Sequence, residues 1–503
     1  MSFFRHSAVV GGLVALSLPA CLVHSVEREP KPPLEAPEKF SEAGEQGAAA
    51  HGRWWSTLGD KELEGLVERA LAHNFQLRQS WARLRQSRAV ARAAAAGLFP
   101  NLDVTTSAGR SKSAPRIFNL GGTEQTIPGS ETNSFNASIP LSYELDVWGR
   151  VRSGWFAAQE DELAARADVE TAALTLAANV TERWLDLLEQ RALLRLVGQQ
   201  LKHAAAFRDL VALRFTGAQG ALSDVYQQEQ QVQQLEAQKV ALDTAEALAD
   251  KQLSVLLGAA PNVRARAARE VLPEPPPLPD VGVPARLLND RPDLRLLRHR
   301  VVAADYRLGQ AIAARFPTLQ LTGSIGFSAT ALAQFFDSFV WSFLGSLSAN
   351  LWDGGRRGAE VERAEAVIDD TLAAYGQALL GALYDVEATL VQERQQRARI
   401  RLAEEQLATA NKTVEAAKLR YEAGVAEGYL TALTAILSQQ GADRSLLTER
   451  RRLVSLRVQL YRALGGAWSR ELAEPKVERR PEPDAEPKAA PATDAEPKDG
   501  EGA

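Results

Sequence analysis

The stretch FPTLQLTGSIGFS, from Phe316 to Ser328, repeats the stretch FPNLDVTTSAGRS, from Phe99 to Ser111. WGR at residues 148–150 likewise matches GGR at residues 354–356. LRF at residues 213–215 matches LRY at residues 419–421. The numbering offset is 217 for the first pair (316 − 99) and 206 for the other two (356 − 150 and 420 − 214). Landmarks that recur in order at a nearly fixed offset indicate an internal duplication. The chain is therefore one structural unit written twice.

The repeated stretch alternates apolar and polar side chains, as an amphipathic β-strand does. Leu319, Leu321, Ile325 and Phe327 fall on one face, and Gln, Thr and Ser residues fall on the other. The same alternation recurs elsewhere and predicts four strands, at about residues 101–112, 134–145, 318–329 and 338–351. The first two are separated by residues 113–130, a stretch rich in Gly, Pro, Asn and Thr that we expect to be a loop.

Strands with one apolar and one polar face suit two architectures. One is a sandwich with a wetted side, and the other is a membrane barrel that faces lipid outward and water inward. Four strands cannot close a barrel, and an unpaired strand edge finds no hydrogen-bonding partner inside a membrane. A barrel would therefore need two or three copies of the chain. Twelve strands from three copies suit an aqueous pore better than eight from two.

The helical segments are too long for a globular core. The first runs from Val151 to about Arg214, some 64 residues (214 − 151 + 1), which is roughly 95 Å at 1.5 Å per residue. Apolar residues within it follow the three-, four- and seven-residue steps of a coiled-coil seam. Each repeat is predicted to fold into a long helical hairpin, with breaks at residues 216–221 and 422–429.

Glycines and cations mark these two breaks. Gly217, Gly220, Gly424 and Gly428 are expected to supply the positive φ values of tight turns between helices. Each incoming helix also ends in an arginine followed by an aromatic residue, and a cation there complements the helix dipole. These pairs would serve any helical hairpin.

The N-terminus has the pattern of a bacterial export signal. An apolar run is followed by Leu-Pro-Ala-Cys, which resembles a lipobox and predicts that Cys21, the single cysteine, is acylated after cleavage. The alternative is an ordinary signal peptide cut nearby. Two acyl chains would anchor the chain firmly. The resemblance to a lipobox implies that Leu22, in place of aspartate, favours sorting to the outer membrane. No later stretch has about 18 uninterrupted apolar residues, so we expect no membrane-spanning helix after the signal.

These patterns divide the chain into six segments. They are a signal peptide at 1–20, a lipid anchor and extended linker at 21–53, a first structural repeat at 54–260, an inter-repeat linker at 261–284, a second structural repeat at 285–470, and a Pro/Glu/Lys-rich tail at 471–503 that its composition predicts to be disordered.

Composition and motifs exclude several classes of function. A net charge of −5, with acidic and basic residues interspersed, does not favour nucleic acid as a partner. The six histidines are scattered, and the sequence contains no metal-binding spacing, phosphate loop, dinucleotide fingerprint or nucleophile elbow. We therefore expect no metal site and no enzymatic activity.

Six motifs occur in an order that resembles one known family. They are YELDVWGRVRSG at 143–154, RPDL at 291–294, WDGGRR at 352–357, RYEAGV at 420–425, YLTAL at 429–433 and LYRALGGAW at 460–468. Together they are similar to the outer-membrane factor (TolC-like) family, and specifically to its NodT-type efflux lipoproteins.

This resemblance implies an α+β membrane protein. Its long helical hairpins would form a periplasmic tunnel, and its four strands per chain would contribute to a trimeric, twelve-stranded outer-membrane β-barrel. The implied function is that of a passive conduit in a tripartite efflux system, exporting small molecules. The implied partners are two further copies of the chain, a periplasmic adaptor (membrane fusion) protein, an inner-membrane pump of the RND type and outer-membrane lipid. No cofactor is implied other than the covalent lipid on Cys21.

The resemblance also implies roles for residues at the hairpin tips. The entrance and adaptor-docking residues would be Arg214, Phe215, Gly217, Asp224, Arg420, Tyr421 and Gly424. The second hairpin departs from the family pattern, because Thr434 stands where relatives place an acid that lines the pore, and Gly428 is an extra residue. A ring of acids favours cations, so selectivity is expected to differ here. The alternatives are a non-pore envelope lipoprotein with long coiled-coil helices and a lipid-anchored hydrolase.

Overall fold

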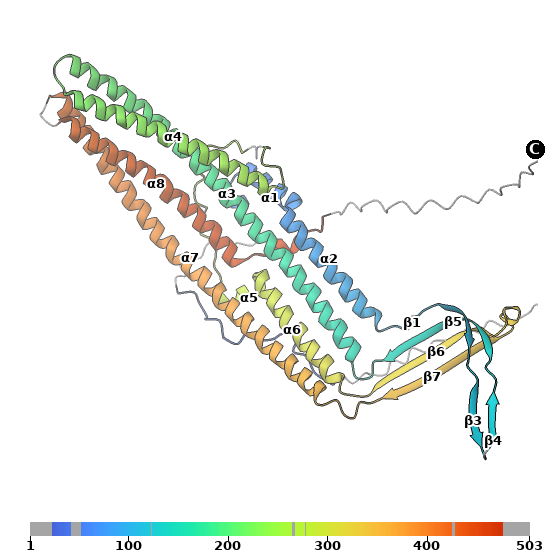
Figure 1. The fold of residues 1–503 in the computed structure, drawn as a ribbon. Coiled ribbons are helices and arrows are strands. Elements are labelled where there is room, and N and C mark those ends of the chain that lie inside the picture. The colour runs from blue at the N-terminus through green and yellow to red at the C-terminus, as the bar shows by residue number, and fades with distance from the viewer. Residues whose placement is uncertain are drawn as a thin grey trace, which may run out of the picture.

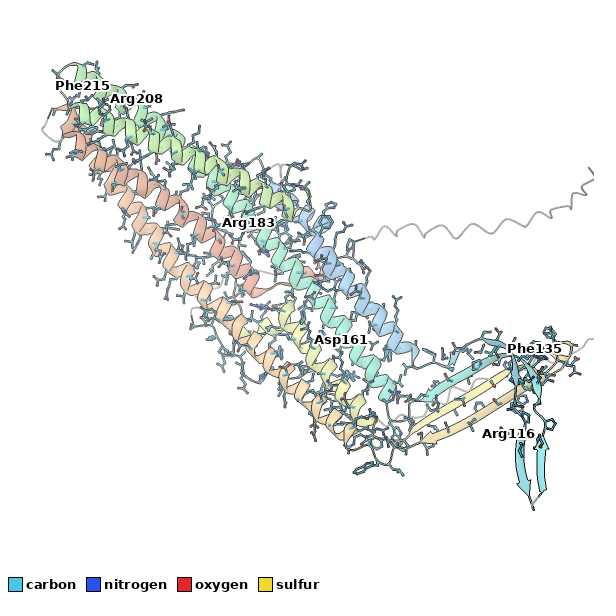
Figure 2. All side chains as sticks on the ribbon, viewed as in Figure 1. Arg116, Phe135, Asp161, Arg183, Arg208 and Phe215 are labelled. Carbon is cyan, nitrogen blue, oxygen red and sulfur yellow. The ribbon has the colours of Figure 1, made fainter. Side chains whose placement is uncertain are left out.

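The computed structural model describes residues 23–41, 52–121, 123–263, 267–276, 278–424 and 428–475. The expected signal peptide, Cys21 and the tail from residue 476 onward lie outside these ranges. The described chain is elongated, with strands at one end and the turns of two helical hairpins at the other (Figure 1). Phe135 and Phe215 mark these two ends (Figure 2).

The helices of the two repeats correspond one to one. The first repeat has α1 (Lys61–His73), α2 (Phe75–Ala96), α3 (Arg150–Thr216) and α4 (Leu222–Leu256), and the second has α5 (Leu287–Asp290), α6 (Pro292–Ala313), α7 (Arg356–Glu422) and α8 (Gly428–Leu464). Both α3 and α7 have 67 residues, and a single numbering offset of 206 relates their starts and their ends (356 − 150 and 422 − 216). At 1.5 Å per residue each is about 100 Å long.

The strands form one main sheet that joins the repeats. Its strands are β1 (Asn101–Leu102), β2 (Thr105–Lys112), β5 (Glu131–Leu145), β6 (Thr318–Ala329) and β7 (Phe339–Ser348). β1 and β2 both pair with β5 in one register, so they occupy a single strand position. The order is therefore β1/β2–β5–β6–β7, all antiparallel, with β5 of the first repeat paired to β6 of the second. The expectation of four strand positions per chain is confirmed.

One face of this sheet is apolar across its strands. The registers place Ile139 beside Ile325 and Ile325 beside Trp341, and they place Leu141 and Phe343 on either side of a glycine in β6. Trp341 is 70% exposed and Phe343 is 63% exposed in the single chain. The opposite face carries mainly Ser, Thr, Asn and Gln side chains. The sheet thus presents an uncovered apolar face, unlike the inner face of a sandwich.

The stretch between the first two predicted strands is not the open loop that its composition indicated. It contains a second hairpin, β3 (Arg116–Leu120) with β4 (Thr123–Ile127), which forms its own two-stranded sheet. This hairpin projects from the end of the main sheet (Figure 1). Gly121 supplies the positive φ at its turn, and β-branched residues in both strands favour the extended backbone.

Helix packing follows the duplication. α3 contacts α2 and α4 of its own repeat and α6 and α8 of the other repeat, and α7 packs against α6 and α8 (Figure 1). The largest apolar core joins α1, α2 and α3 to α8, and it includes Trp55, Trp184 and Tyr461. No helix in the described part of the chain is long and apolar enough to cross a membrane.

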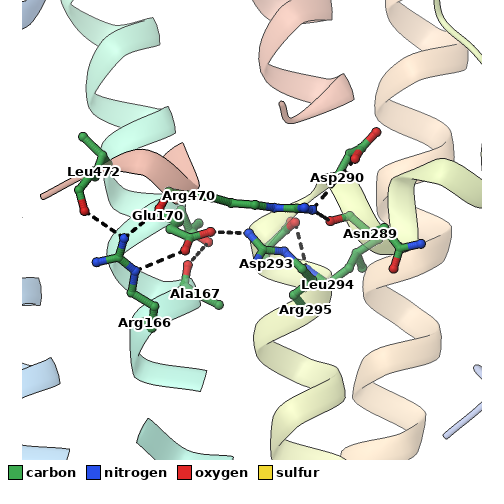
Figure 3. A network of polar contacts seen from close by, with 11 residues as sticks. Arg166, Ala167, Glu170, Asn289, Asp290, Asp293, Leu294, Arg295, Arg470 and Leu472 are labelled. Atoms are coloured by element: carbon green, nitrogen blue, oxygen red, sulfur yellow. Dashed lines mark hydrogen bonds and ion pairs between the residues drawn. The ribbon is translucent and has the colours of Figure 1, made fainter. Parts of the chain in front are cut away.

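Charged side chains reinforce the contact between the repeats. Arg166 and Glu170 of α3, Arg295 of α6 and Arg470 near the C-terminus form a continuous polar network (Figure 3). Farther along, Arg451 of α8 contacts three acids of α3, namely Glu182, Asp186 and Glu189. These contacts hold α3 against both α6 and α8 of the second repeat.

The two flanking segments pack on the body more than their composition indicated. Phe40 of the N-terminal segment is buried in the core around α7, and Pro33 packs on Gly376. Farther along the same segment, Ser41 donates two hydrogen bonds to Glu387. The described start of the tail is also docked, since Glu474 forms ion pairs with two arginines of α2. Disorder from residue 471 was therefore wrong for residues 471–475, and the rest of the tail lies outside the described residues.

Candidate functional site at the hairpin tips

The two hairpin turns lie side by side at the end of the molecule opposite the strands (Figure 1). α3 ends at Thr216 and α4 begins at Leu222, whereas α7 ends at Glu422 and α8 begins at Gly428. The tips share a small apolar core in which Val211 of α3 packs with residues of α7 and α8, namely Ala417, Tyr421, Tyr429, Ala432 and Ala435. Each tip is thus held by the other.

The turn geometry corrects the expected roles of the glycines. Gly424 does have a positive φ of 74°, but Gly217 has a φ of −80° and is the C-terminal cap of α3. The positive φ of the first turn belongs to Ala218, at 56°. The offset of 206 relates Ala218 to Gly424 (424 − 218), so the duplication preserves the turn geometry but not the glycine. Gly428 is the first residue of α8, and a Cβ there would approach the Tyr421 Cα to 3.1 Å.

Arg214 joins the two hairpins. It lies in the last turn of α3, but its guanidinium donates hydrogen bonds to the main-chain carbonyls of Tyr421 and Glu422 at the end of α7. The guanidinium carbon also lies 4.4 Å from the centroid of the Tyr421 ring, within cation–π distance. Arg214 therefore satisfies two of the free C-terminal carbonyls of α7, in addition to complementing the dipole of its own helix.

Three aromatic rings pack behind this arginine. The Phe207 ring lies 5.5 Å from the Tyr421 ring and 6.0 Å from the Tyr429 ring, and the two tyrosines are 6.2 Å apart. The Tyr429 hydroxyl donates to the Gln228 side chain at 3.4 Å. Burial raises the pKa of both tyrosines, and the charge of Asp224 raises it further. Their hydroxyls therefore stay protonated at physiological pH, as neutral members of the tip core.

The remaining tip residues have more exposed positions. Asp224 is half-buried in the first turn of α4, where a carboxylate complements the helix N-terminus. Phe215 is 40% exposed, and Arg420 and Gly424 are exposed. Thr434 is exposed on α8, on the same face as two exposed leucines one turn away on either side. This face of α8 therefore carries an exposed hydroxyl at Thr434.

Sequence reasoning missed Phe207 and Gln228 as members of this site. Phe207, Val211 and Arg214 are spaced at i, i+4 and i+7, which places them on one helix face, and this spacing was the available signal. Gln228 gave no comparable signal, because a single glutamine on a polar helix is usually solvated.

A cavity of about 560 Å³ lies between the hairpins, next to the tip core. The side chain of Gln200 is buried there, and neither its amide nitrogen nor its oxygen has a hydrogen-bond partner among the described residues. Most of the polar lining consists of amides, namely Gln199, Gln200, Gln228, Gln231, Asn411, Gln439 and Gln440. No group of three or more His, Cys, Asp or Glu side chains in the described ranges could hold a metal ion. The lining also includes the ionisable side chains of His203, Lys418, Glu422 and Asp443.

Comparison with known proteins identifies this architecture. A family model described as outer membrane efflux protein matches residues 66–259 and again residues 283–466, once for each repeat. The chain belongs to the outer membrane efflux protein family. It is thus an outer-membrane efflux channel protein, and its family is one of transport proteins rather than enzymes.

Similar outer membrane efflux proteins align with nearly the whole chain. It is 30% identical over 437 residues to the pyoverdine export outer membrane protein OpmQ of Pseudomonas aeruginosa, covering 86% of this chain and 92% of that protein. It is 31% identical over 477 residues to outer membrane protein OprJ of the same organism, covering 91% and 95%. Among solved structures, the outer-membrane channel OprN matches with a TM-score of 0.82 at 26% identity, covering 89% of this chain and all of that one.

Proposed function

We propose that three copies of this chain assemble into a passive conduit through which a tripartite efflux system exports small molecules. The observation that carries this proposal is the sheet, which has an exposed apolar face and, among the described residues, an unpaired edge on each side, at β2 and at β7. Inside a membrane both edges must be paired. Antiparallel pairing of β7 with β2 of the next copy satisfies them, and three copies give a twelve-stranded ring.

The two faces of the sheet suit this assignment. Apolar residues of β5, β6 and β7 form the surface that would meet lipid. Polar side chains on the other face bond to one another across the strands, as in the 2.9 Å contact of Ser324 with Ser342 and the 2.7 Å contact of Ser328 with Asn136. A hydroxyl- and amide-lined interior is typical of a water-filled barrel.

We assign the contacts with partner proteins to the end of the molecule that carries the hairpin tips. The hairpin tips would dock a periplasmic adaptor protein, which couples the channel to an inner-membrane pump of the RND type that supplies the energy. The names of relatives support a role in efflux but span several cargoes: pyoverdine for OpmQ, toluene for TtgI of Pseudomonas putida and cations for CusC of Escherichia coli. We therefore assign cargo selection to the pump, and small molecules in general to this conduit.

The anchor is the remaining part of the proposal. Cys21 is assigned the covalent lipid that holds the N-terminus at the outer membrane, and no other cofactor is required. The chain has no other cysteine, so mass spectrometry of the mature N-terminus tests the assignment directly. Cys21→Ser should remove the lipid mass. An unmodified mature N-terminus in the parent chain would refute the anchor without touching the conduit.

The conduit is tested by single-channel recording in planar lipid bilayers. The purified chain should have three times the mass of one copy, and its conductance should rise when Arg214→Ala loosens the contact between its tips. A monomer that gives no conductance, with or without that substitution, would refute the proposal. That outcome would favour the alternative, a non-pore envelope protein that uses its helices as a bridge.

A further inference from the structure

Arg420 is the counterpart of Arg214 in the second repeat, but its side chain is exposed among the described residues. The offset of 206 that relates α3 to α7 relates Arg214 to Arg420, Phe215 to Tyr421, and Thr216 to Glu422. Within the chain, Arg214 binds the last two carbonyls of α7 and lies over the Tyr421 ring. Arg420, by contrast, is exposed at the open side of the tip.

The same imbalance extends along the two long helices. Leu174, Ala178 and Leu185 of α3 are buried, with exposed fractions of 6%, 4% and 0%. Their counterparts in α7, at the same offset of 206, are exposed, namely Leu380 at 49%, Tyr384 at 71% and Val391 at 38%. α3 is covered because a second repeat packs beside it, whereas α7 has no third repeat in the chain. The open face of α7 is thus the free half of a repeat–repeat contact.

A second copy of this chain is the occupant that fits this face. It carries the end of α3, the element that is equivalent to the end of α7. The ring of Phe215 is 40% exposed there, and it occupies the position that Tyr421 has in the second repeat. The free edges of β7 and β2 at the other end of the molecule call for a neighbour in the same order, second repeat to first.

We propose that Arg420 of each copy caps α3 of the neighbouring copy. Its guanidinium donates hydrogen bonds to the main-chain carbonyls of Phe215 and Thr216 of that copy and lies over the Phe215 ring. The tips of the assembly are then joined by arginine contacts that alternate, with Arg214 acting within a chain and Arg420 between chains. This inference rests on the proposed trimer, and it assigns the residue that closes the trimer at the tips.

Cysteine cross-linking tests this contact. The pair Arg420→Cys and Thr216→Cys, treated in intact membranes with a short bismaleimide that replaces the length of the arginine side chain, should give covalent trimers on a denaturing gel. The matched control is the pair Arg214→Cys and Glu422→Cys, which has the same spacing within one chain and should run as a monomer. The unmodified chain, treated with the same reagent, should also remain monomeric.

The outcomes separate this inference from the proposed function. Native mass measured before denaturation shows whether the three copies have assembled. An assembled trimer whose Arg420–Thr216 pair yields only monomers overturns the Arg420 contact and leaves the conduit intact, as does a control pair that links copies together. A chain that never assembles overturns both. In the uncross-linked protein, Arg420→Ala should lower the temperature at which trimers dissociate more than Arg214→Ala does, because only the former removes a contact between chains.

Discussion

An arginine placed on the apolar face of β7 should disrupt assembly in a membrane, whereas the same arginine one residue away should not. Phe343 lies on the apolar face and Ser342 on the polar face, next to each other in the strand. We therefore compare Phe343→Arg with Ser342→Arg. The two variants have the same charge and almost the same depth, and they differ only in the face that carries the substitution.

The magnitude follows from the position of Phe343 in its strand. β7 has 10 residues, about 33 Å at 3.3 Å per residue, and a tilt of about 40° reduces its height to about 25 Å, the height of the apolar band of such barrels. Phe343 is the fifth residue and so lies near the midplane. Arginine facing lipid there costs about 2–4 kcal/mol per chain. That corresponds to a factor of about 30 to 1,000 in the folding equilibrium.

The assay is folding into lipid vesicles over a series of urea concentrations, followed by the yield of assembled trimer. Phe343→Arg should lower the free energy of unfolding by about 2–4 kcal/mol per chain, which appears as an unfolding midpoint at lower urea. Ser342→Arg should stay within about 1 kcal/mol of the parent chain, because a side chain facing the water-filled interior keeps its hydration. Equal losses for the two variants, or a larger loss for Ser342→Arg, would refute the assignment of the apolar face to lipid.

Three further predictions concern the chain contacts, the helix bundle and the turn. Paired residues of β5 and β6 have numbers that sum to 464, and the repeat offsets convert this sum to 453 for β7 paired with β2 of the next copy (464 − 217 + 206). Cysteines at Ser346 and Ser107, whose numbers sum to 453, should therefore link copies. Cysteines at Ser348 and Ser107 should not. Burial raises the pKa of Glu189, although the charge of Arg451 opposes this shift. The folded chain therefore keeps the Glu189 proton to higher pH than the unfolded chain does, and stability falls as pH rises from the pKa of the unfolded state to that of the folded state. Glu189→Gln should flatten a plot of melting temperature against pH over this range. Ala218→Gly should raise the free energy of unfolding by about 0.5–1 kcal/mol in urea titration, because it relieves a positive φ, and an unchanged or lower value would contradict this.

Patterns that depend on periodicity were readable from the sequence. Alternation at residues 134–145 and 318–329 located two strands whose structural bounds are Glu131–Leu145 and Thr318–Ala329. The duplication also carried information about pairing. The hairpin registers sum to 243 for β2–β5 and 666 for β6–β7, and the two repeat offsets account for the whole difference (243 + 217 + 206). The β2–β5 pair of the first repeat and the β6–β7 pair of the second repeat therefore have the same register.

Features that depend on tertiary context were not readable in the same way. The hairpin β3–β4 lies in a stretch rich in Gly, Pro and Thr, whose composition favours a loop. A few apolar residues among prolines and acids, such as Phe40, give no periodic signal, so the docking of the N-terminal segment was hidden. Arg214 was assigned to the dipole of its own helix, because its contact with a carbonyl in the other repeat cannot be inferred from local spacing.

The duplication explains why this fold leaves so much apolar and hydrogen-bonding surface uncovered in one chain. Two repeats make one contact between them, through β5 with β6, α3 with α6 and α8, and Arg214 with α7. In a closed ring each repeat contacts the next one, so the number of contacts equals the number of repeats. A chain of two repeats contains one such contact and must therefore form another with a neighbouring chain on each of its two sides. The uncovered surfaces occur where that count requires them, at β7, along α7 and at Arg420 on one side, and at β2 and the end of α3 on the other. A single chain thus has a packed body but incomplete flanks, and closure of the ring pairs both edges of the main sheet at once.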